Sequence, residues 1–74
     1  MKNLIKVERA RHDLSQQQLA DLLGVSRQSI YAIEGRIFVP STILALRIAQ
    51  LFNLKVEDIF KLEESEQCTP LPMN

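Results

Sequence analysis

The stretch that decides the fold covers residues 15–34 and reads Ser-Gln-Gln-Gln-Leu-Ala-Asp-Leu-Leu-Gly-Val-Ser-Arg-Gln-Ser-Ile-Tyr-Ala-Ile-Glu. Ser15, followed three residues later by Gln18, is the pattern of a capping box, in which each side chain bonds the backbone N–H of the other residue. Apolar residues then share one side of a short helix: Leu19, Ala20, Leu22 and Leu23. Gly24 can adopt the left-handed conformation that closes such a helix. The stretch therefore predicts a helix that begins after Ser15 and ends at Gly24.

A second helix is predicted directly after this glycine. Ser26 caps it, and Ile30 and Ile33 face inward at a spacing of three. The remaining side chains of the helix point outward: Arg27, Gln28, Ser29, Tyr31 and Ala32. In a helix-turn-helix that reads DNA, the second helix lies in the major groove with its N-terminal residues at the base edges. Residues 15–34 therefore predict a sequence-specific DNA-binding motif.

The composition indicates a single small domain. The 74 residues are 46% apolar, with two glycines and three prolines, which suits one packed helical core. Residues 1–9 are too interrupted by charge for a secretory signal, and no apolar run is long enough to cross a bilayer. The single Cys68 cannot form an internal disulfide, which fits a reducing cytosol. We expect a cytoplasmic protein with no membrane association.

The net charge of zero hides an uneven distribution along the chain. Residues 1–56 carry eight Lys and Arg against four Asp and Glu, a net charge of +4. Residues 57–74 carry one lysine against five acids, a net charge of −4. Affinity for duplex DNA depends strongly on the neutralisation of phosphates, so the positive part is the part suited to DNA. The acidic end is expected to weaken non-specific binding.

Three further helices are predicted outside the motif. The first covers residues 3–12, with an inward stripe formed by Leu4 or Ile5, Val7 and Ala10 and with Lys2, Lys6, Glu8 and Arg11 in solvent. Residues 36–40 form a loop whose apolar side chains fold back on the core. Ser41 caps a helix over residues 42–52, which is apolar around most of its girth and is therefore expected to be central. Residues 56–60 form a short fifth helix, with Ile59 and Phe60 packing inward.

These elements define the domain boundaries. We expect a helix-turn-helix domain over residues 1–62 and an acidic, flexible C-terminal tail over residues 63–74, the last eight or so residues being disordered.

Many positions of the chain resemble the Xre/Cro–repressor family of helix-turn-helix regulators, most closely its very short bacterial and phage members. The resemblance covers residues 3–62 and is carried by Leu14-Ser15-Gln16, Leu19-Ala20, residues 23–30, Ile33-Glu34 and Pro40-Ser41. It implies an all-α, compact five-helix, lambda-repressor-like DNA-binding domain. It also implies a nucleoid-associated homodimer on an imperfect palindrome, with half-sites about 34 Å apart. We expect the protein to repress transcription and not to activate it.

The resemblance also implies which residues contact DNA. Gln16 matches a glutamine that bonds a phosphate and braces the recognition helix. Arg27 and Gln28 match the positions that enter the groove first, where arginine suits guanine and glutamine suits adenine at about 1–3 kcal/mol of discrimination each. Ala32 can touch only a thymine methyl, Ser29 and Tyr31 can reach the sugar-phosphate backbone, and Ser26 and Ser41 cap helices whose free N–H groups suit phosphates. The predicted DNA contacts are Gln16, Gln17, Ser26, Arg27, Gln28, Ser29, Tyr31, Ala32, Arg36 and Ser41.

The chain departs from the family pattern directly after the motif. Family members usually have a glycine two residues after the glutamate that matches Glu34, and then a basic residue. Here the glycine comes one residue early as Gly35, Arg36 takes the glycine position and Ile37 replaces the basic residue. Either Arg36 adopts a strained backbone or the loop is rebuilt, and Arg36 is the substitute for the phosphate contact. The family also implies an ion pair between Glu34 and Arg9, so Arg9 is not counted among the DNA contacts.

The apolar residues of the C-terminal half exceed what so small a core can bury. The surplus consists of Ile43, Leu51, Phe52, Leu54, Ile59, Phe60 and Leu62. Part of it, from the fifth helix and adjacent residues, is expected to form a two-fold homodimer interface. Residues 61–63 alternate like a short strand, which we expect to pair across the dimer.

Other kinds of site find little support in the sequence. His12 has no His or Cys at ligand spacing, so we expect no metal, and no catalytic triad, phosphate loop or carboxylate pair is present. We expect no cofactor, no small-molecule effector and no role for the Cys68 thiol. The alternative function is an antitoxin or a protein-interaction adaptor built on the same fold, for which DNA binding would be secondary.

Overall fold

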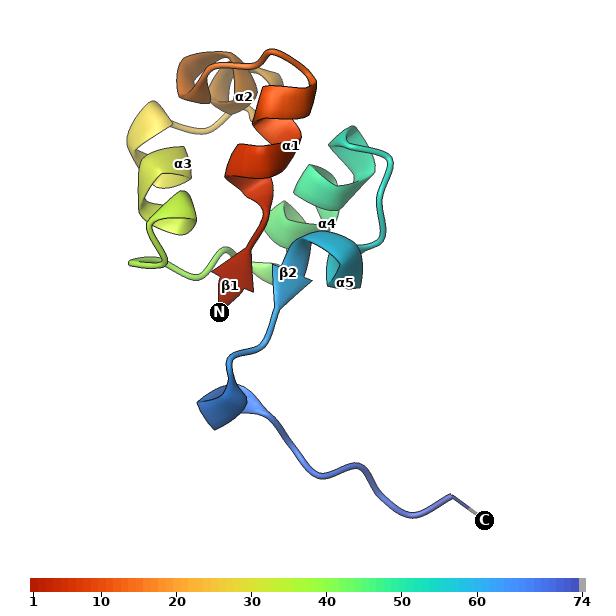
Figure 1. The fold of residues 1–74 in the computed structure, drawn as a ribbon. Coiled ribbons are helices and arrows are strands. Elements are labelled where there is room, and N and C mark those ends of the chain that lie inside the picture. Colours follow the sequence, from red (N-terminus) through yellow and green to blue (C-terminus); the bar gives the residue numbers. More distant parts are fainter. Residues whose placement is uncertain (74) are drawn as a thin grey trace.

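The computed structural model describes residues 1–73, which form five short α-helices around one small core (Figure 1). The helices are α1 (Ile5–Arg11), α2 (Gln16–Leu23), α3 (Arg27–Glu34), α4 (Thr42–Leu51) and α5 (Val56–Ile59). Two-residue strands β1 (Lys2–Asn3) and β2 (Phe60–Lys61) and a 3-10 helix η1 (Glu64–Glu66) complete the fold. The predicted all-α five-helix domain is confirmed.

The caps predicted from the sequence set the bounds of the helix-turn-helix. The Ser15 hydroxyl accepts from the backbone N–H of Gln18 at 3.0 Å, and the Gln18 side chain accepts from the N–H of Ser15 at 2.8 Å. Gly24 takes φ +70°, and the N–H groups of Val25 and Gly24 bond back to the carbonyls of Ala20 and Asp21 in a Schellman motif. The turn between α2 and α3 is therefore only three residues long.

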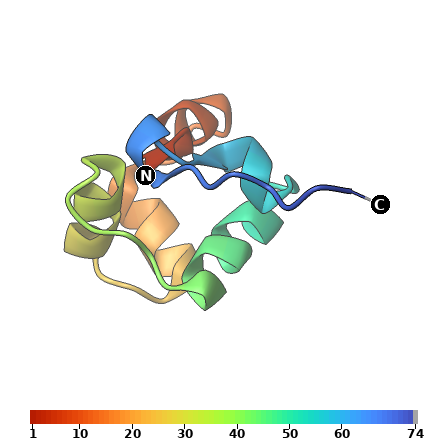
Figure 2. The same ribbon diagram turned by 90° about the horizontal axis from the view of Figure 1, so that it is seen from below.

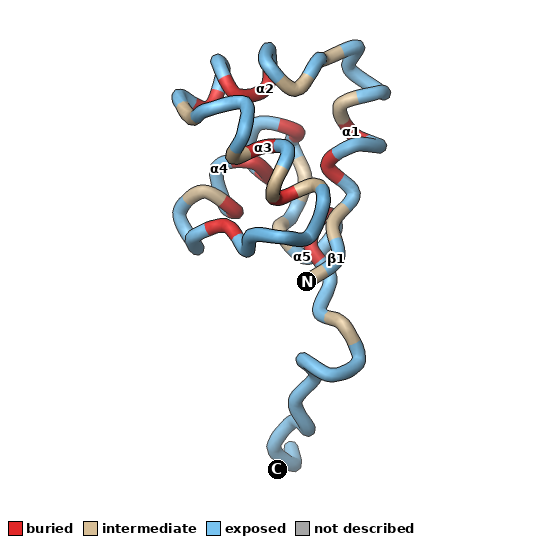
Figure 3. The backbone as a smooth tube through the Cα atoms, turned by 90° about the vertical axis from the view of Figure 1, so that its left-hand side faces the viewer, coloured by how far each residue is buried: buried red, intermediate tan, exposed pale blue. Residues whose placement is uncertain are grey.

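The core is built from one side of every helix, and these inward sides appear in red in Figure 3. The fully buried large side chains are Ile5, Leu19, Ile30, Ile33, Ile48 and Ile59. They come from all five helices, so α2 and α3 are fixed to each other and also to the rest of the domain. No helix within residues 1–73 is long and apolar enough to span a membrane.

The two strands close the chain on itself. β1 and β2 pair antiparallel, with Lys2 opposite Lys61 and Asn3 opposite Phe60. The predicted strand at residues 61–63 is thus shifted to residues 60–61, and the expectation that it pairs across a dimer is wrong, because its partner is the N-terminus of the same chain. The pairing also starts α1 at Ile5 and not at residue 3.

The inward faces of α1 and α2 differ from the prediction. In α1 the buried residues are Ile5 and Glu8, which lie one turn apart, whereas Val7 and Ala10 are exposed. Glu8 was expected in solvent, but it is only 7% exposed and its carboxylate lies 3.4 Å from the guanidinium of Arg11. In α2 the buried residues are Leu19, Ala20 and Leu23, and Leu22 is 57% exposed at the edge of this face.

The loop after α3 is also exposed where it was expected to be buried. The N–H groups of Ile37 and Phe38 both bond the carbonyl of Ala32, at 2.9 and 3.2 Å. The backbone is therefore held against the end of α3 while the side chains of Ile37, Phe38 and Val39 remain at the surface. Only Pro40 of this loop is buried.

The apolar surplus divides differently from the expectation. Ile59 and Phe60 pack inward as predicted, and together with Phe52 they belong to the core of the single chain, so they are not available to a partner. By contrast α4 is not surrounded on all sides, because Ile43 is 72% exposed and Leu46 is 52% exposed. The predicted central position of α4 is therefore wrong, and one of its apolar faces is open.

Candidate nucleic-acid interface

The outer face of α3 presents the side chains expected to read bases. The hydroxyl of Ser26 accepts from the backbone N–H of Ser29 at 3.1 Å and lies 2.9 Å from the Ser29 hydroxyl. Ile30 and Ile33 anchor the opposite face in the core. Arg27 and Gln28, in the first turn, are exposed and make no side-chain hydrogen bond or ion pair with the rest of residues 1–73. Their donors are therefore free for a ligand outside the chain.

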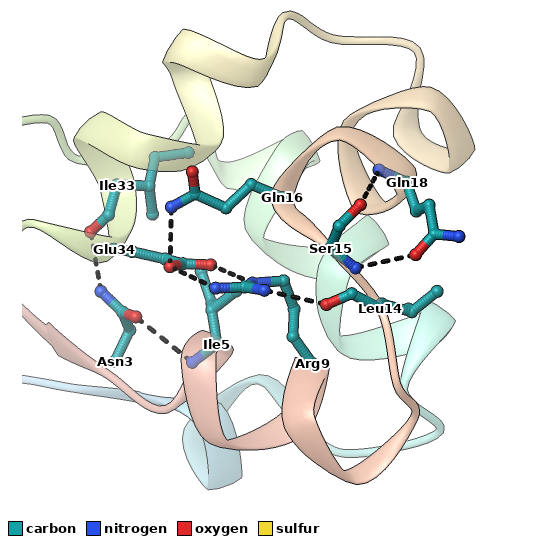
Figure 4. A network of polar contacts seen from close by, with 9 residues as sticks. All are labelled: Asn3, Ile5, Arg9, Leu14, Ser15, Gln16, Gln18, Ile33 and Glu34. Carbon is teal, nitrogen blue, oxygen red and sulfur yellow. Dashed lines mark hydrogen bonds and ion pairs between the residues drawn. The ribbon is translucent and has the colours of Figure 1, made fainter.

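The C-terminal end of α3 is fixed by a polar network around Glu34 (Figure 4). The Arg9 guanidinium donates from Nε to Oε2 at 2.6 Å and from Nη2 to Oε1 at 3.0 Å. Its Nη1 donates to the carbonyl of Leu14 at 2.8 Å, and Gln16 Nε2 donates to Glu34 Oε1 at 3.2 Å. The predicted Arg9–Glu34 ion pair is confirmed, and Gln16 braces the recognition helix as expected.

The Arg9–Glu34 pair is largely shielded from water. The side chains are 14% and 8% exposed, and the bidentate geometry is the strong form of a guanidinium–carboxylate contact. The hydrogen bond to Glu34 raises the pKa of Arg9 above its already high ordinary value. The network therefore joins α1, the start of α2 and the end of α3 into one rigid support.

Two further residues hold the motif in place and were not singled out from the sequence. Asn3 Nδ2 donates to the carbonyl of Ile33 at 2.8 Å, which ties β1 to the last turn of α3. Arg47 Nη2 donates to the carbonyl of Leu23 at 2.8 Å, which ties α4 to the last turn of α2. Both contacts join residues far apart in the chain, so no local sequence pattern predicts them.

The side chains of the other predicted DNA contacts, in α2, in α3 and at the start of α4, differ in how exposed they are. Tyr31 is 60% exposed, whereas Ala32 and Ser29 are half-buried. Gln17 is exposed, and its Nε2 donates to Asp21 Oδ1 at 2.8 Å within α2. Ser41 caps α4 by accepting from the N–H of Leu44 at 3.1 Å. The contact of each of these residues with DNA stays a prediction.

Arg36 adopts the first of the two alternatives that the sequence left open. Its φ of +63° is left-handed, whereas Gly35 has an ordinary helical φ of −78°. The chain thus keeps the backbone of a glycine at a position that holds arginine. The Arg36 side chain is half exposed, and its guanidinium forms an ion pair with Glu63.

An open apolar groove lies on the α4–α5 side of the domain. It has a volume of about 620 Å³ and is lined by Ile43, Leu46, Arg47, Ala49, Gln50, Asn53, Leu54, Lys55 and Val56. Exposed apolar surface of this kind is typical of an interaction site. Within residues 1–73 no three His, Cys, Asp or Glu side chains gather as they would around a metal ion.

Comparison with known proteins gives a consistent result. Residues 5–59 match the protein family described as Helix-turn-helix. The chain is 53% identical to an HTH-type transcriptional regulator of Methanocaldococcus jannaschii over 66 residues. This aligned region covers 89% of this chain and 100% of that protein. The chain is 50% identical over 64 residues to the HTH-type transcriptional regulator YgzD of Bacillus subtilis, with 86% and 97% covered. It is 39% identical over 61 residues to the ImmF control region 10 kDa protein of Bacillus phage phi105, with 82% and 67% covered.

Proposed function

We propose that this chain, which belongs to the Xre/Cro-type helix-turn-helix family of DNA-binding transcriptional regulators, represses transcription by binding a palindromic operator as a homodimer. In this proposal α3 enters the major groove, with Arg27 and Gln28 at the base edges. The observation that carries the proposal is the free first turn of α3 on a rigid support. Arg27 and Gln28 are exposed and unpaired within residues 1–73, while the other end of the helix is fixed through Glu34.

Phosphate contacts would place this helix in register on the duplex. Gln16, Gln17, Ser26, Ser29, Tyr31, Arg36 and Ser41 are the side chains proposed for this role, and Ala32 is proposed to touch a thymine methyl. Gln16 has a second amide hydrogen beyond the one given to Glu34, so bracing and phosphate binding are compatible.

The homodimer is proposed to form through the α4–α5 groove. Two recognition helices can read half-sites one DNA turn apart only if the two subunits are held at that spacing. Ile43, Leu46, Leu54 and Val56 supply a connected apolar surface there. A two-fold interface is self-complementary, so the same groove would serve in both subunits.

The proposal is tested by selecting bound sequences from a pool of random DNA duplexes. We expect a palindromic motif with half-sites about one helical turn apart, and an affinity that falls steeply with salt. Arg27→Ala should weaken binding to the selected motif by about 1–3 kcal/mol for each half-site. Lys61→Ala, which removes an exposed cation from β2, should leave the motif unchanged.

The rival function, an antitoxin or adaptor module, predicts a different result. An unenriched pool would contradict the operator-binding proposal. Under the rival function, Arg27→Ala would leave the complex with the partner protein intact. The exposed apolar loop with Ile37, Phe38 and Val39 is the observation that favours a protein partner.

A further inference from the structure

A side chain of the acidic segment that follows β2 contacts the loop after the recognition helix. In Figure 1 the chain runs from β2 away from the helices and forms η1 below the N-terminus, and in Figure 2, seen from below, η1 lies beside the N-terminus. In this region the carboxylate of Glu63 forms an ion pair with the guanidinium of Arg36, a residue proposed above to bind a DNA phosphate. The family match ends at residue 59, so the acid of this pair lies beyond it.

Glu63 is held in place by its own neighbours and by the N-terminus, since the ammonium group of Met1 lies 3.7 Å from Glu63 Oε2 and 3.2 Å from Glu66 Oε1. The backbone N–H of Glu63 donates to Glu66 Oε1 at 2.7 Å, and Gln67 Nε2 donates to the carbonyl of Leu62 at 3.3 Å. Glu63 is partly buried, whereas residues 64–73 are exposed. The carboxylate is therefore presented by a formed turn and is not carried on a loose end.

The backbone also directs the partner residue. The backbone of Arg36 has a left-handed conformation. Its N–H donates to the carbonyl of Ile33 at 3.0 Å, and the N–H of Ile37 donates to the carbonyl of Ala32 at 2.9 Å. The base of the Arg36 side chain is thereby fixed at the end of α3. Its guanidinium can turn toward Glu63 or toward a neighbouring anion, but the same N–H groups cannot serve both.

A carboxylate and a phosphodiester offer a guanidinium the same chemistry, since each presents two anionic oxygens to its planar array of donors. Glu63 and a DNA phosphate are therefore competitors for Arg36. The competition is reinforced by the net charge of −4 on residues 57–74, which repels the duplex.

We propose that Glu63 is an affinity-determining residue that occupies Arg36 in the free protein and must release it before Arg36 can bind a backbone phosphate. The proposal rests on the proposed DNA-binding function. Because phosphates carry no base identity, Glu63 lowers affinity by the same factor on every sequence. It therefore sets how tightly the protein binds and not which operator it chooses.

The test is a double-mutant cycle on duplex affinity, measured on the selected motif and on an unrelated duplex. Glu63→Gln keeps the size of the side chain and removes its charge. We expect affinity to rise about two- to five-fold at low salt on both duplexes, the range of an exposed ion pair. The dependence of log K on log salt should steepen by up to about 0.9, as for one further phosphate contact.

Two variants make the cycle specific. In an Arg36→Gln background, Glu63→Gln should gain no more than the loss of one negative charge gives, because the cation for which it competes is absent. Glu64→Gln is the matched control, since it removes the same charge at the next residue. The Glu64 side chain is exposed and forms no ion pair within residues 1–73. Its gain should be smaller than that of Glu63→Gln.

Each outcome separates the two proposals. If the wild-type chain binds duplexes but Glu63→Gln gains no more than Glu64→Gln, or gains equally with Arg36→Gln present, the role of Glu63 is refuted and the DNA-binding function stands. If neither the wild-type chain nor Glu63→Gln binds any duplex, the DNA-binding function itself is refuted. Thermal unfolding of each variant establishes that the domain remains folded.

Discussion

Single residues of the motif are predictable where the physical cause is local. Ser15, Gln18 and Gly24 are assigned correctly from the sequence because a cap involves atoms only three or four residues apart. Arg36 shows the limit of this reasoning. The sequence reveals that glycine is missing from its usual position, but two backbones are compatible with that observation. The contacts of the loop with Ala32, which decide between them, depend on the folded end of α3.

Gly24 gives a prediction at this scale. Nothing lies within 4 Å of a Cβ added there, so Gly24→Ala meets no steric clash and its cost comes from φ +70° alone. We expect the free energy of unfolding to fall by about 1 kcal/mol. Urea unfolding measures the change. A neutral result would mean that the turn can relax to an ordinary backbone.

At the scale of elements, the existence of all five helices follows from the sequence, whereas the face that each helix buries does not. The apolar pattern of α1 was compatible with several inward faces. The structure buries Ile5 and Glu8, and the helix begins at Ile5, after the residues that pair with β2. The support of α3 was predicted in part. Arg9, Glu34 and Gln16 are implied by the family, but Asn3 acts through a contact 30 residues away in the chain.

The Glu34 network provides the prediction for this scale. Glu34→Gln leaves the mostly buried Arg9 guanidinium without its counter-charge, and we expect a loss of about 3 kcal/mol of stability. The raised pKa of Arg9 means that this contribution is complete below its ordinary pKa. This stabilisation is lost only as the pH rises through the pKa that Arg9 has in the folded protein, which is higher still. The loss should therefore be equal at neutral and mildly alkaline pH.

Urea unfolding of Glu34→Gln at both pH values checks this prediction. Gln17→Ala is the control, because it removes an exposed contact with Asp21 and should cost less than about 0.5 kcal/mol. Similar losses for the two variants would mean that the Glu34 network adds no more than a surface contact.

At the scale of the whole molecule, the sequence shows how many apolar and charged residues the chain has, but not where they lie in the fold. The apolar surplus was visible from composition. The inward packing of Ile59 and Phe60 was predicted, but the burial of Phe52 and the exposure of Leu46 were not. The split of charge along the chain was visible too. That one of the acids meets Arg36 depends on the path taken by the chain after β2, which no local pattern encodes.

The open face of α4 yields a prediction for the assembled protein. Leu46→Lys places a charge in the α4–α5 groove and should convert the proposed dimer into a monomer, with operator affinity falling at least tenfold. Leu22→Lys is the matched control, since Leu22 is also about half exposed but does not line this groove. Sedimentation equilibrium gives the state of association. A wild-type monomer, or an equal effect of Leu22→Lys, would contradict the proposed interface.

The central claim is that the first turn of α3 reads bases. The most direct measurement is selection from random duplexes carried out in parallel with the wild-type chain, Arg27→Ala and Gln28→Ala. We expect each variant to lose its base preference at one symmetric pair of positions in the palindrome. The lost base should be guanine for Arg27 and adenine for Gln28, with the rest of the motif retained. A wild-type motif that both variants reproduce unchanged would contradict the claim, because α3 would then not be the element that reads the sequence.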